Sequence, residues 1–491
     1  MNIVLKVLLI VPVLFAIYTT DSMVLEHHGF RQSQTMLQTL YIDHSTNFID
    51  FILPVFGPPW MVPMEYPLYQ IIINVISNHT TIDPVYIAAL VSMLSLYTVA
   101  YFVSKLIADS KKKYIGIVIT SPVLLYYSNK YLIDLFAVAL SIIAFVYFHK
   151  SITNQQEKNK WIMSIFLALT GLQKITVLIP LGFGILTNLW LNNKNLKSFI
   201  SKKNLHFLLL LILPIAIALS WVYYSDNIKL NNYLTSFLTS SEMRGDNFGT
   251  VSYRLNLANQ SEFFGKLILL TGIFPVIVLL FFKIIRISLD NLSVSLFVIG
   301  LSSAFIFFKL HVVHDYYYIM SSVYMMAGAL RSIEINSKNP GNIVLVVAFI
   351  NLVTMQFLYS DRYTGIAQSH INFLESARYI NKTTNDSDII LSMGADWDST
   401  LPLYSNRKFI MIPEWSKLRG AHEYVEEIIK TINLKDIGAI LLCDSRINKE
   451  HKAKMYRFIE RIKDRVERFG TCNVFNKPDA KDINNFLSIL K

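Results

Sequence analysis

The sequence predicts a mainly α-helical, polytopic membrane protein with a small α/β domain at its C-terminal end. Its 491 residues are 53% hydrophobic and only 16% charged, whereas soluble domains carry about 25% charged residues. Long apolar runs recur over residues 3–359, and short apolar runs alternate with charged helical patterns beyond residue 360. This composition excludes a soluble cytoplasmic enzyme, a disordered chain and a nucleic-acid-binding module.

The first apolar run, residues 3–19, is expected to be an uncleaved membrane anchor. The segment FAIYTTDS offers a poor cleavage site, which argues against a secretory signal. Several later runs are shorter than the roughly 20 residues of a straight span, and the two within 161–193 would also fit one helical hairpin. Counting every run gives about 11 transmembrane helices: 3–19, 84–104, 114–127, 131–149, 161–173, 175–193, 206–224, 265–282, 291–308, 316–330 and 342–359.

Loop charges predict the orientation. The first outer loop, 20–83, holds one basic residue, Arg31, and six acidic ones. The loops on the other side hold fifteen Lys and Arg against four Asp and Glu, which explains most of the net charge of +11. Because basic loops stay in the cytoplasm, we expect a cytoplasmic N-terminus and an extracytoplasmic C-terminal domain. The loops counted are 105–113, 150–160, 194–204, 283–290 and 331–341.

The C-terminal part, 361–491, is expected to be an extracytoplasmic α/β domain beside a membrane module of residues 1–360. Apolar runs at 388–393, 408–412 and 438–443 predict strands, and charged helical spacing predicts helices over 420–431 and 449–468. Cys443 and Cys472 allow at most one disulfide. The segment Asp396-Trp397-Asp398 would suit either sugar binding or packing on the membrane module.

The first outer loop is too long to be a simple connector. It contains EHHGFRQSQT (26–35) and FGPPWMVPMEYPLYQ (56–70), in which Gly and Pro residues fix the backbone before Glu65. Ionisable residues near lipid are candidates for a functional site. The simpler alternative is that Arg31 and Glu65 pair to hold the loop on the helix bundle.

Further ionisable residues occur in the predicted spans, each at the outer end under this topology. Structural ion pairs scattered through the bundle would not all lie at the outer ends of the spans. Lys174 taken alone would also fit a lysine whose ammonium snorkels to the membrane surface. With Glu26 and Glu65 they form the candidate outer site: Asp134, Lys174, His311, His314 and Asp315.

Carboxylates, histidines, Arg and Lys at a membrane surface suit a polyanionic head group, and a lipid-linked phosphate is the natural candidate. Arg and Lys would hold the phosphate, or a divalent metal would do so through carboxylate and His ligands. A carboxylate base would direct an acceptor hydroxyl at a sugar C1 in a single inverting displacement. The chain has no P-loop or GxGxxG motif, in keeping with a donor that is not a nucleotide.

The motifs resemble the GT-C superfamily of integral-membrane glycosyltransferases. The likeness is to bacterial members of glycosyltransferase family 39, related to protein O-mannosyltransferases and lipid A aminoarabinose transferases. Their pattern H-x-[WF]-R-Q-x-[QD]-T is His28-Gly-Phe-Arg-Gln-Ser-Gln-Thr35 here, followed by GPPW and by E-[FY]-P-L-Y at residues 65–69. The segments GLQKITVLIP, HDYYY and ADWDSTLPLYSNRKFIMIP are similar to later motifs of the group.

The resemblance implies a GT-C fold, a polyprenyl-phosphate sugar donor and an acceptor on the outer face, with a first-loop carboxylate as base. The mannosyltransferases have an Asp-Glu pair where this chain has Arg31-Gln32. The base is therefore expected to be Glu26 or, failing that, Asp21. Arg31, Gln32 and Lys174 would contact the donor phosphate.

Glu65 would orient the donor or bind a divalent metal (Mg, Mn or Zn) together with His314. We expect a hexosyl- or pentosyltransferase of the bacterial inner membrane, acting on a glycan, lipid or protein acceptor. A flippase of lipid-linked saccharides and an O-antigen-type polymerase or ligase are the alternatives. The remaining donor-orienting candidates are Asp134, His28, His314, Asp315 and Tyr316.

Overall fold

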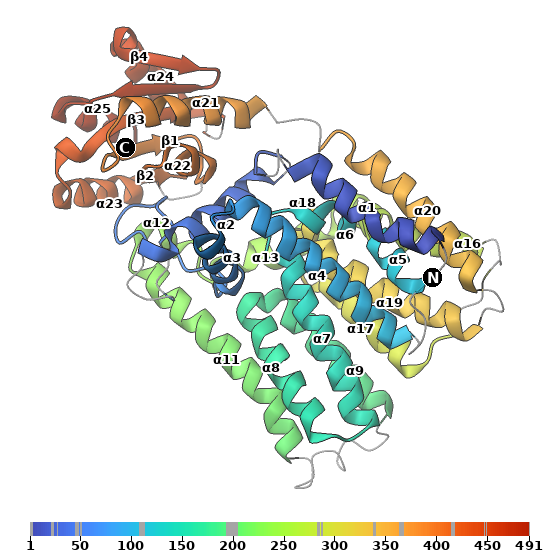
Figure 1. The fold of residues 1–491 in the computed structure, drawn as a ribbon. Helices are drawn as coiled ribbons and strands as arrows, with labels where there is room; N and C mark the ends of the chain where they lie inside the picture. Colours follow the sequence, from blue (N-terminus) through green and yellow to red (C-terminus); the bar gives the residue numbers. More distant parts are fainter. Residues whose placement is uncertain are drawn as a thin grey trace. The chain divides into compact units, whose positions relative to one another are not determined.

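The computed structural model divides the chain into two compact units, which we describe separately (Figure 1). The helical unit comprises Met1–Asp21, Val85–Val222 and Arg244–Asp361. The sheet unit comprises Ser22–Pro84, Tyr223–Met243 and Arg362–Lys491. The structure describes residues 3–20, 24–26, 28–44, 49, 52–107, 113–192, 205–281, 285, 288–336, 340–362, 368–413, 418–445, 447 and 449–490.

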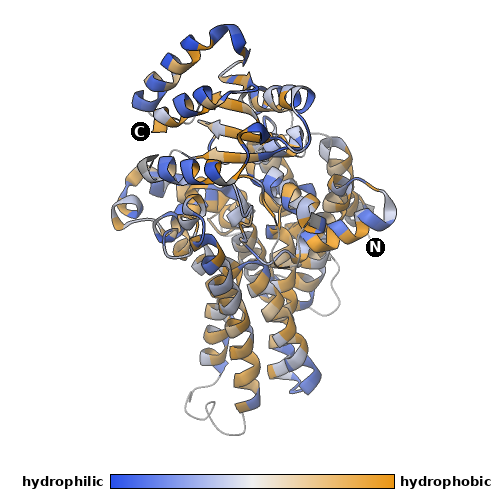
Figure 2. Cartoon of the chain, turned by 90° about the vertical axis from the view of Figure 1, so that its left-hand side faces the viewer, coloured by the Kyte–Doolittle hydropathy of each residue, from blue (hydrophilic) through white to orange (hydrophobic). Residues whose placement is uncertain are grey.

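Apolar helices make up the helical unit, and Figure 2 shows them orange over most of their length. Their bounds are α1 (Ile3–Thr19), α4 (Pro84–Ile107), α5 (Lys113–Ile119), α6 (Pro122–Tyr126), η3 (Tyr127–Asn129), α7 (Asp134–Thr153), α8 (Glu157–Gln173), α9 (Ile175–Asn192), α11 (Leu205–Leu230), α13 (Arg244–Phe248), α14 (Val251–Leu255), α15 (Leu257–Leu270), α16 (Phe274–Phe281), α17 (Asn291–Ile306), α18 (Phe308–Val313), η5 (Asp315–Tyr317), α19 (Tyr318–Asn336) and α20 (Pro340–Tyr359).

Among the described helices, α4, α7, α9 and α11 are long and apolar enough to cross a membrane. The pair α15 and α16, bent by 90°, would count as a fifth span. Shorter apolar helices lie at Lys6–Thr19, Asn291–Ile306 and Leu345–Tyr359. The expected number of about 11 spans is therefore not confirmed and stays a prediction.

Two of the predicted spans are broken helices. The run 114–127 divides into α5 and α6 at Ser121, and the run 265–282 bends at Gly272, which has a φ of +75°. Ser121 and Ser322 lie 2.6 Å apart at their hydroxyls, and both donate to the carbonyl of Thr271 at 3.2 and 2.9 Å. These side chains satisfy a backbone carbonyl that the bend frees inside an apolar bundle.

Small residues bring α7, α9, α17 and α19 close together. A Cβ at Gly184 of α9 would lie 2.0 Å from Cγ1 of Ile299 of α17. A Cβ at Gly300 of α17 would lie 2.6 Å from Cγ of Met325 of α19. Close packing at small residues is the usual way in which helices associate in lipid. It fixes the four helices that surround the buried lysine described below.

The sheet unit contains a five-stranded sheet in the order β2-β1-β3-β5-β4. Strands β1, β2 and β3 are parallel, and β5 is antiparallel to both β3 and β4. The elements are α2 (Gly29–Tyr41), η2 (Ile42–His44), α3 (Leu68–Thr80), α12 (Tyr233–Ser236), α21 (Gln368–Thr383), β1 (Ile389–Met393), α22 (Thr400–Ser405), β2 (Lys408–Ile412), α23 (Leu418–Thr431), η6 (Leu434–Asp436), β3 (Ile437–Cys443), α24 (Lys449–Arg461), η7 (Lys463–Arg465), β4 (Val466–Phe469), β5 (Cys472–Asn476) and α25 (Ala480–Leu490).

The first outer loop pairs with the edge of this sheet. The amide of Phe409 donates to the carbonyl of Pro54 at 3.0 Å, and the amide of Met411 donates to the carbonyl of Val55 at 2.8 Å. An antiparallel bridge joins Phe56 to Ile410. The sequence placed this loop in the membrane module, whereas in the structure it belongs to the same unit as residues 362–491.

The three predicted strands match β1, β2 and β3. The helix predicted over 449–468 is wrong at its end, because α24 stops at Arg461 and residues Val466–Phe469 form β4. Cys443 and Cys472 lie opposite each other in the β3–β5 register and form a disulfide. That bond ties the parallel half of the sheet to the antiparallel half.

Candidate functional site

In the sheet unit the candidate residues cluster where α2 begins. His28 has a φ of +61°, and its carbonyl accepts hydrogen bonds from the amides of Arg31 and Gln32 at 2.9 and 3.0 Å. This turn starts the helix within the segment HGFRQSQT. One helical turn therefore carries both Arg31, which is half-buried, and Gln32, which is buried.

Arg31 binds two side chains. Its Nη2 donates to Oε1 of Glu65 at 2.6 Å, and its Nη1 donates to Oε1 of Gln34 at 2.6 Å. The side chains of Arg31 and Glu65 are 15% and 22% exposed. The ion pair is thus partly shielded and still open to solvent on one side.

The turn that precedes Glu65 is held by hydrogen bonds to its carbonyls. The Asn232 side chain donates to the carbonyl of Phe56 at 3.2 Å, and the hydroxyl of Tyr424 donates to that of Pro58, also at 3.2 Å. A tyrosine hydroxyl is protonated at neutral pH and can donate, and burial raises the pKa of Tyr424 further. Gly57, with a φ of +79°, permits the turn.

Glu26, the expected base, is 2% exposed, and its backbone carbonyl accepts a hydrogen bond from the amide of Gly29 at 2.8 Å. Asp21, the second candidate, lies outside the described residues. The structure thus places Glu26 three residues before the start of α2, in the same unit as the Arg31–Glu65 pair.

Helix α2 packs on α22 of the same unit. The Trp397 ring stacks on Phe56 at 5.4 Å and meets Phe30 edge-on at 5.2 Å. Ser33 and Thr400 join the helices through buried hydroxyls 3.1 Å apart. Trp397 therefore contacts both motifs of the first outer loop within the sheet unit, whereas the sequence had offered packing on the membrane module or sugar binding.

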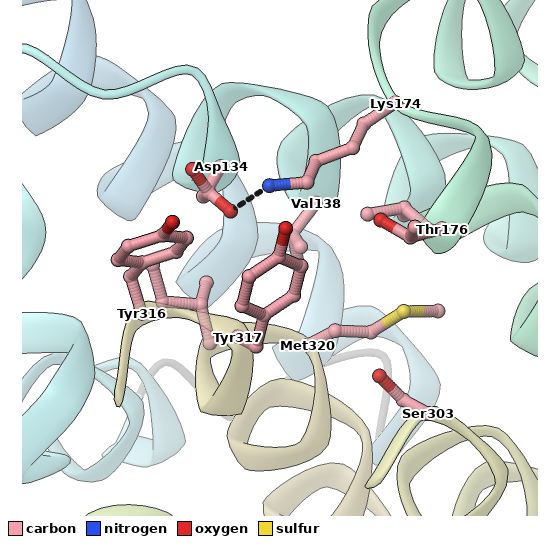
Figure 3. A pocket seen from close by; sticks show the side chains of 10 residues that line it. Asp134, Val138, Lys174, Thr176, Ser303, Tyr316, Tyr317 and Met320 are labelled. Carbon is pink, nitrogen blue, oxygen red and sulfur yellow. Dashed lines mark hydrogen bonds and ion pairs between the residues drawn. The ribbon is translucent and has the colours of Figure 1, made fainter. Parts of the chain in front are cut away.

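In the helical unit the candidate group is built around Lys174. This residue is extended (φ −163°, ψ 103°) and forms a one-residue break between α8 and α9. Its ammonium pairs with Oδ1 of Asp134, and both side chains are 5% exposed. The same ammonium lies 4.4 Å from the ring centre of Tyr317 and 5.4 Å from that of Tyr316 (Figure 3). Lys174 is therefore a buried cation with a carboxylate and two aromatic rings around it.

The segment 311–317 continues this group. Asp315 accepts a hydrogen bond from the hydroxyl of Tyr127. His314 stacks on Tyr316 with ring centres 5.2 Å apart. His311 is buried, and its Nδ1 lies 2.9 Å from the carbonyl of Phe307. His314, Asp315 and Tyr316 thus lie in the same unit as Asp134 and Lys174, and their shared role with Glu26 and Glu65 stays a prediction.

A pocket opens beside the Lys174–Asp134 pair. Its cavity volume is about 10 Å³, which is near the minimum for one water molecule. Two polar atoms on its wall, Oδ2 of Asp134 and Oγ1 of Thr176, are buried and find no hydrogen-bond partner among the described residues. The side chains that matter for its chemistry are Asp134, Lys174, Thr176, Ser303, Tyr317 and Met320.

The metal site expected from Glu65 and His314 is not confirmed. No three His, Cys, Asp or Glu side chains among them are grouped so that they would hold an ion. Glu65 instead pairs with Arg31. We therefore route no chemical step through a metal.

Several site residues were missed from the sequence. Gln34 lies three positions after Arg31 on the same helical face, a spacing that would have revealed it. Tyr317 lies next to the predicted Tyr316 and is the ring nearer to Lys174. Tyr127 and Thr176 gave no signal, because a Tyr and a Thr in apolar runs are ordinary.

Comparisons with known proteins bear on the fold. The crystal structure of ArnT from Cupriavidus metallidurans bound to undecaprenyl phosphate superposes with a TM-score of 0.62 at 11% identity, over 96% of this chain and 99% of that one. Archaeal oligosaccharyltransferase AglB from Archaeoglobus fulgidus, in complex with an inhibitory peptide and a dolichol-phosphate, gives 0.50 at 11% identity over 93% and 71%. Its apo form gives 0.51 over the same shares.

By sequence, no protein-family model and no curated protein matches the chain. Membership of glycosyltransferase family 39 accordingly stays a prediction. The similarity to ArnT and AglB extends over nearly the whole of this chain and concerns the fold. The chain shares the fold of these two proteins, which is the fold that the motif resemblance implied.

Proposed function

We propose that the protein is a membrane glycosyltransferase that moves a sugar from a polyprenyl-phosphate donor to an acceptor hydroxyl. The GT-C fold supports this proposal, since the ArnT structure holds undecaprenyl phosphate and the AglB structure holds a dolichol-phosphate. The observation that carries it is the buried Lys174 ammonium in the helical unit, surrounded by Asp134 and two tyrosine rings. A buried cation of this kind suits a phosphate at a membrane surface.

The proposed reaction is one inverting displacement. Glu26, or failing it Asp21, takes the proton of the acceptor hydroxyl. The acceptor oxygen attacks C1 of the sugar, and the bond from C1 to the phosphate oxygen breaks. The lipid phosphate leaves with the electron pair, and a basic side chain offsets its charge, for which Lys174 and Arg31 are the two candidates. No nucleotide and no oxidant or reductant is required.

The other candidates take supporting roles in this proposal. Glu65 holds Arg31 in place, and Gln32 supports the turn that carries it. Asp134 fixes the ammonium of Lys174. A divalent metal stays a prediction from the resemblance alone. The remaining candidates would orient the donor: His28, His314, Asp315 and Tyr316.

We further propose family 39, a bacterial inner membrane and a hexosyl or pentosyl donor, with the N-terminus in the cytoplasm and the sheet domain outside. The Cys443–Cys472 disulfide supports the last point, because disulfides persist in oxidising compartments and are rare in the cytosol. The loop charges support the same orientation.

The test is release of undecaprenyl phosphate from a panel of undecaprenyl-phosphate sugars by the purified full-length protein. We expect release by the wild type and loss of about 100-fold or more in Glu26→Gln, since general bases contribute about 10²–10⁴-fold. Glu467→Gln, an exposed glutamate of the same unit, is the matched control. Full activity in Glu26→Gln would remove Glu26 as the base and make Asp21→Asn the next variant.

Tight binding of a donor without turnover would overturn the transferase and favour a flippase, to be followed by transport in liposomes. Turnover only with lipid-linked oligosaccharides, giving longer chains, would favour an O-antigen-type polymerase or ligase. We expect neither outcome, because the buried pair of Lys174 and Asp134 lies at one end of the predicted spans.

A further inference from the structure

We propose that His370 is a positioning residue for the general base, because its imidazole holds the peptide group from which Glu26 extends. The inference rests on the proposed function, in which Glu26 takes the proton of the acceptor hydroxyl. It gives a residue from the C-terminal part of the chain a role in the first outer loop. Both segments belong to the sheet unit, so the contact lies within one compact unit.

The imidazole contacts the backbone directly before Glu26. Nδ1 of His370 lies 3.1 Å from the carbonyl oxygen of Leu25, 345 residues away in the sequence. A carbonyl oxygen only accepts hydrogen bonds, so Nδ1 carries the hydrogen and donates it. The bond therefore fixes the orientation of the ring and, in its neutral form, the tautomer.

The peptide plane transmits this contact to Glu26. The atoms from Cα of Leu25 to Cα of Glu26 lie close to one plane, so a bond that holds the carbonyl of Leu25 also restrains Cα of Glu26. On the other side, the carbonyl of Glu26 accepts a hydrogen bond from the amide of Gly29 at 2.8 Å. Both peptide groups that flank Glu26 are thus hydrogen-bonded, and its buried side chain starts from a restrained backbone.

Gly29 lets the imidazole approach this turn. A Cβ at residue 29 would lie 2.7 Å from the carbonyl oxygen of Val24 and 3.1 Å from Cε1 of His370. The first distance is too short for any Cβ, and the second would push the ring back from the turn. The glycine of the motif HGFRQSQT therefore serves the close packing of the turn against His370.

An anchored helix carries the imidazole. His370 lies in the first turn of α21. Three later residues of this helix are buried in the core of the sheet unit: Phe373, Ala377 and Ile380. Because this core holds the helix, the ring restrains the loop more than the loop moves the ring.

A structural role and a positioning role of His370 predict different results. If the imidazole only supports the fold, its loss slows the reaction whether or not Glu26 is present. If it positions the base, its loss slows the reaction only while Glu26 acts, because residues that act as a unit are not additive. A misplacement of about 1 Å costs about 100-fold in rate. We therefore expect kcat to fall about 10- to 100-fold and KM for the lipid donor to change by less than about 3-fold.

The experiment is a double-mutant cycle in the full-length protein, with release of undecaprenyl phosphate from undecaprenyl-phosphate sugars as the readout. The four proteins are wild type, His370→Ala, Glu26→Gln and the double variant. We expect His370→Ala to slow the wild type and to leave the residual rate of Glu26→Gln unchanged within about 2-fold. Equal fold losses in both backgrounds would overturn the inference and make His370 a structural residue.

Two conservative variants test which atom of the ring matters. The amide nitrogen of asparagine is bonded to Cγ, as Nδ1 of histidine is, whereas that of glutamine lies one bond further out. His370→Asn should therefore keep kcat within about 3-fold of wild type, and His370→Gln should be as slow as His370→Ala. Equal rates of the Asn and Gln variants would contradict donation from Nδ1. His451→Ala, at a half-buried histidine of α24, is the control.

Failure of the proposed function has a different signature. If Glu26→Gln releases undecaprenyl phosphate at the wild-type rate, the transferase stands and this inference falls. If the wild type releases none, the role in catalysis falls with the transferase, and hydrogen exchange tests the contact itself. The amide of Gly29 should then exchange faster in His370→Ala than in wild type, with β1 and β3 unchanged. Equal exchange of this amide in both proteins would remove the contact as well.

Discussion

The guanidinium of Arg31 lies 2.6 Å from the carboxylate of Glu65, which is 34 residues further along the chain. The contact joins the two motifs of the first outer loop, HGFRQSQT and EYPLY, in one unit. Gln34 takes the other arm of the guanidinium. Hydrogen bonds to these two acceptors hold the Arg31 guanidinium in a fixed orientation. A guanidinium in a fixed orientation suits the binding of an anionic group of a substrate.

Arg31→Lys should therefore impair function more than stability. Lysine keeps the positive charge but lacks the planar guanidinium with which arginine bonds Glu65 and Gln34 at the same time. We expect kcat/KM for the donor to fall about 10-fold or more, and unfolding free energy to change by about 1 kcal/mol or less, because the pair is partly exposed. Arg468→Lys, on exposed β4, is the control. Wild-type kinetics in Arg31→Lys would restrict Arg31 to holding the loop.

Lys174 and Asp134 should behave as one buried unit in a double-mutant cycle. Lys174→Met or Asp134→Asn alone leaves the partner uncompensated, which costs about 3–5 kcal/mol in buried pairs. The double variant should be more stable than the sum of the single losses predicts. Thermal unfolding in detergent measures all four proteins, and strict additivity would show that the pair does not interact.

Trp397→Ala should loosen α2 from the sheet unit. Two aromatic contacts are lost, each contributing about 0.5–1.5 kcal/mol beyond burial. Hydrogen exchange of the α2 amides should accelerate, whereas exchange in β1 and β3 should change little. Trp190→Ala, an exposed tryptophan of the helical unit, serves as control. Unchanged exchange in α2 would mean that other contacts hold it.

The disulfide should stabilise the sheet unit. It closes a segment of 29 residues, for which chain entropy gives about 3–4 kcal/mol. The double variant Cys443→Ala, Cys472→Ala should therefore unfold at a lower temperature than the oxidised wild type. Reducing agent should lower the unfolding temperature of the wild type to that of the double variant, and it should leave the unfolding temperature of the variant unchanged. If both proteins unfolded at the same temperature without reductant, the result would contradict a stabilising disulfide.

Asp444 should make the sheet unit sensitive to acid. Burial alone would raise its pKa, but hydrogen bonds from Tyr456 and Lys452 outweigh it and lower the pKa below 3.8. A lowered folded pKa adds stability above the unfolded value, and this stability is lost as pH falls through the folded pKa. In Asp444→Asn the unfolding free energy of the sheet unit should depend less on pH below about pH 4. If the unfolding free energies of wild type and Asp444→Asn fell equally steeply with decreasing pH, the acid sensitivity would come from other groups.

Local sequence signals predicted much of the fold. Strands β1, β2 and β3 were visible because all are buried, and buried parallel strands are continuous apolar runs. Strand β4 was hidden, because its residues Val466–Phe469 are half exposed and follow a helical charge pattern. Its pairing with β5 is a hairpin closed by the two residues Gly470 and Thr471, a local turn signal that the preceding charge pattern concealed.

The roles of the candidate site residues stay a prediction, and the structure adds which of these residues pair. Spacing and polarity singled out Arg31, Glu65, Asp134 and Lys174, since charged residues are costly near lipid. Which of them pair depends on how loops close over tens of residues, as in Lys174 with Asp134, 40 residues apart. His370 carried no signal at all, because its contact with the first outer loop joins residues 345 apart in the chain.

The most direct test of the account is the anomeric configuration of the product formed from an undecaprenyl-phosphate sugar of known configuration. NMR of the glycosylated acceptor should show inversion at C1, with one undecaprenyl phosphate released for each sugar transferred. Retention at C1 would contradict the single displacement by a carboxylate-activated hydroxyl. Donor binding without any product would contradict the transferase itself.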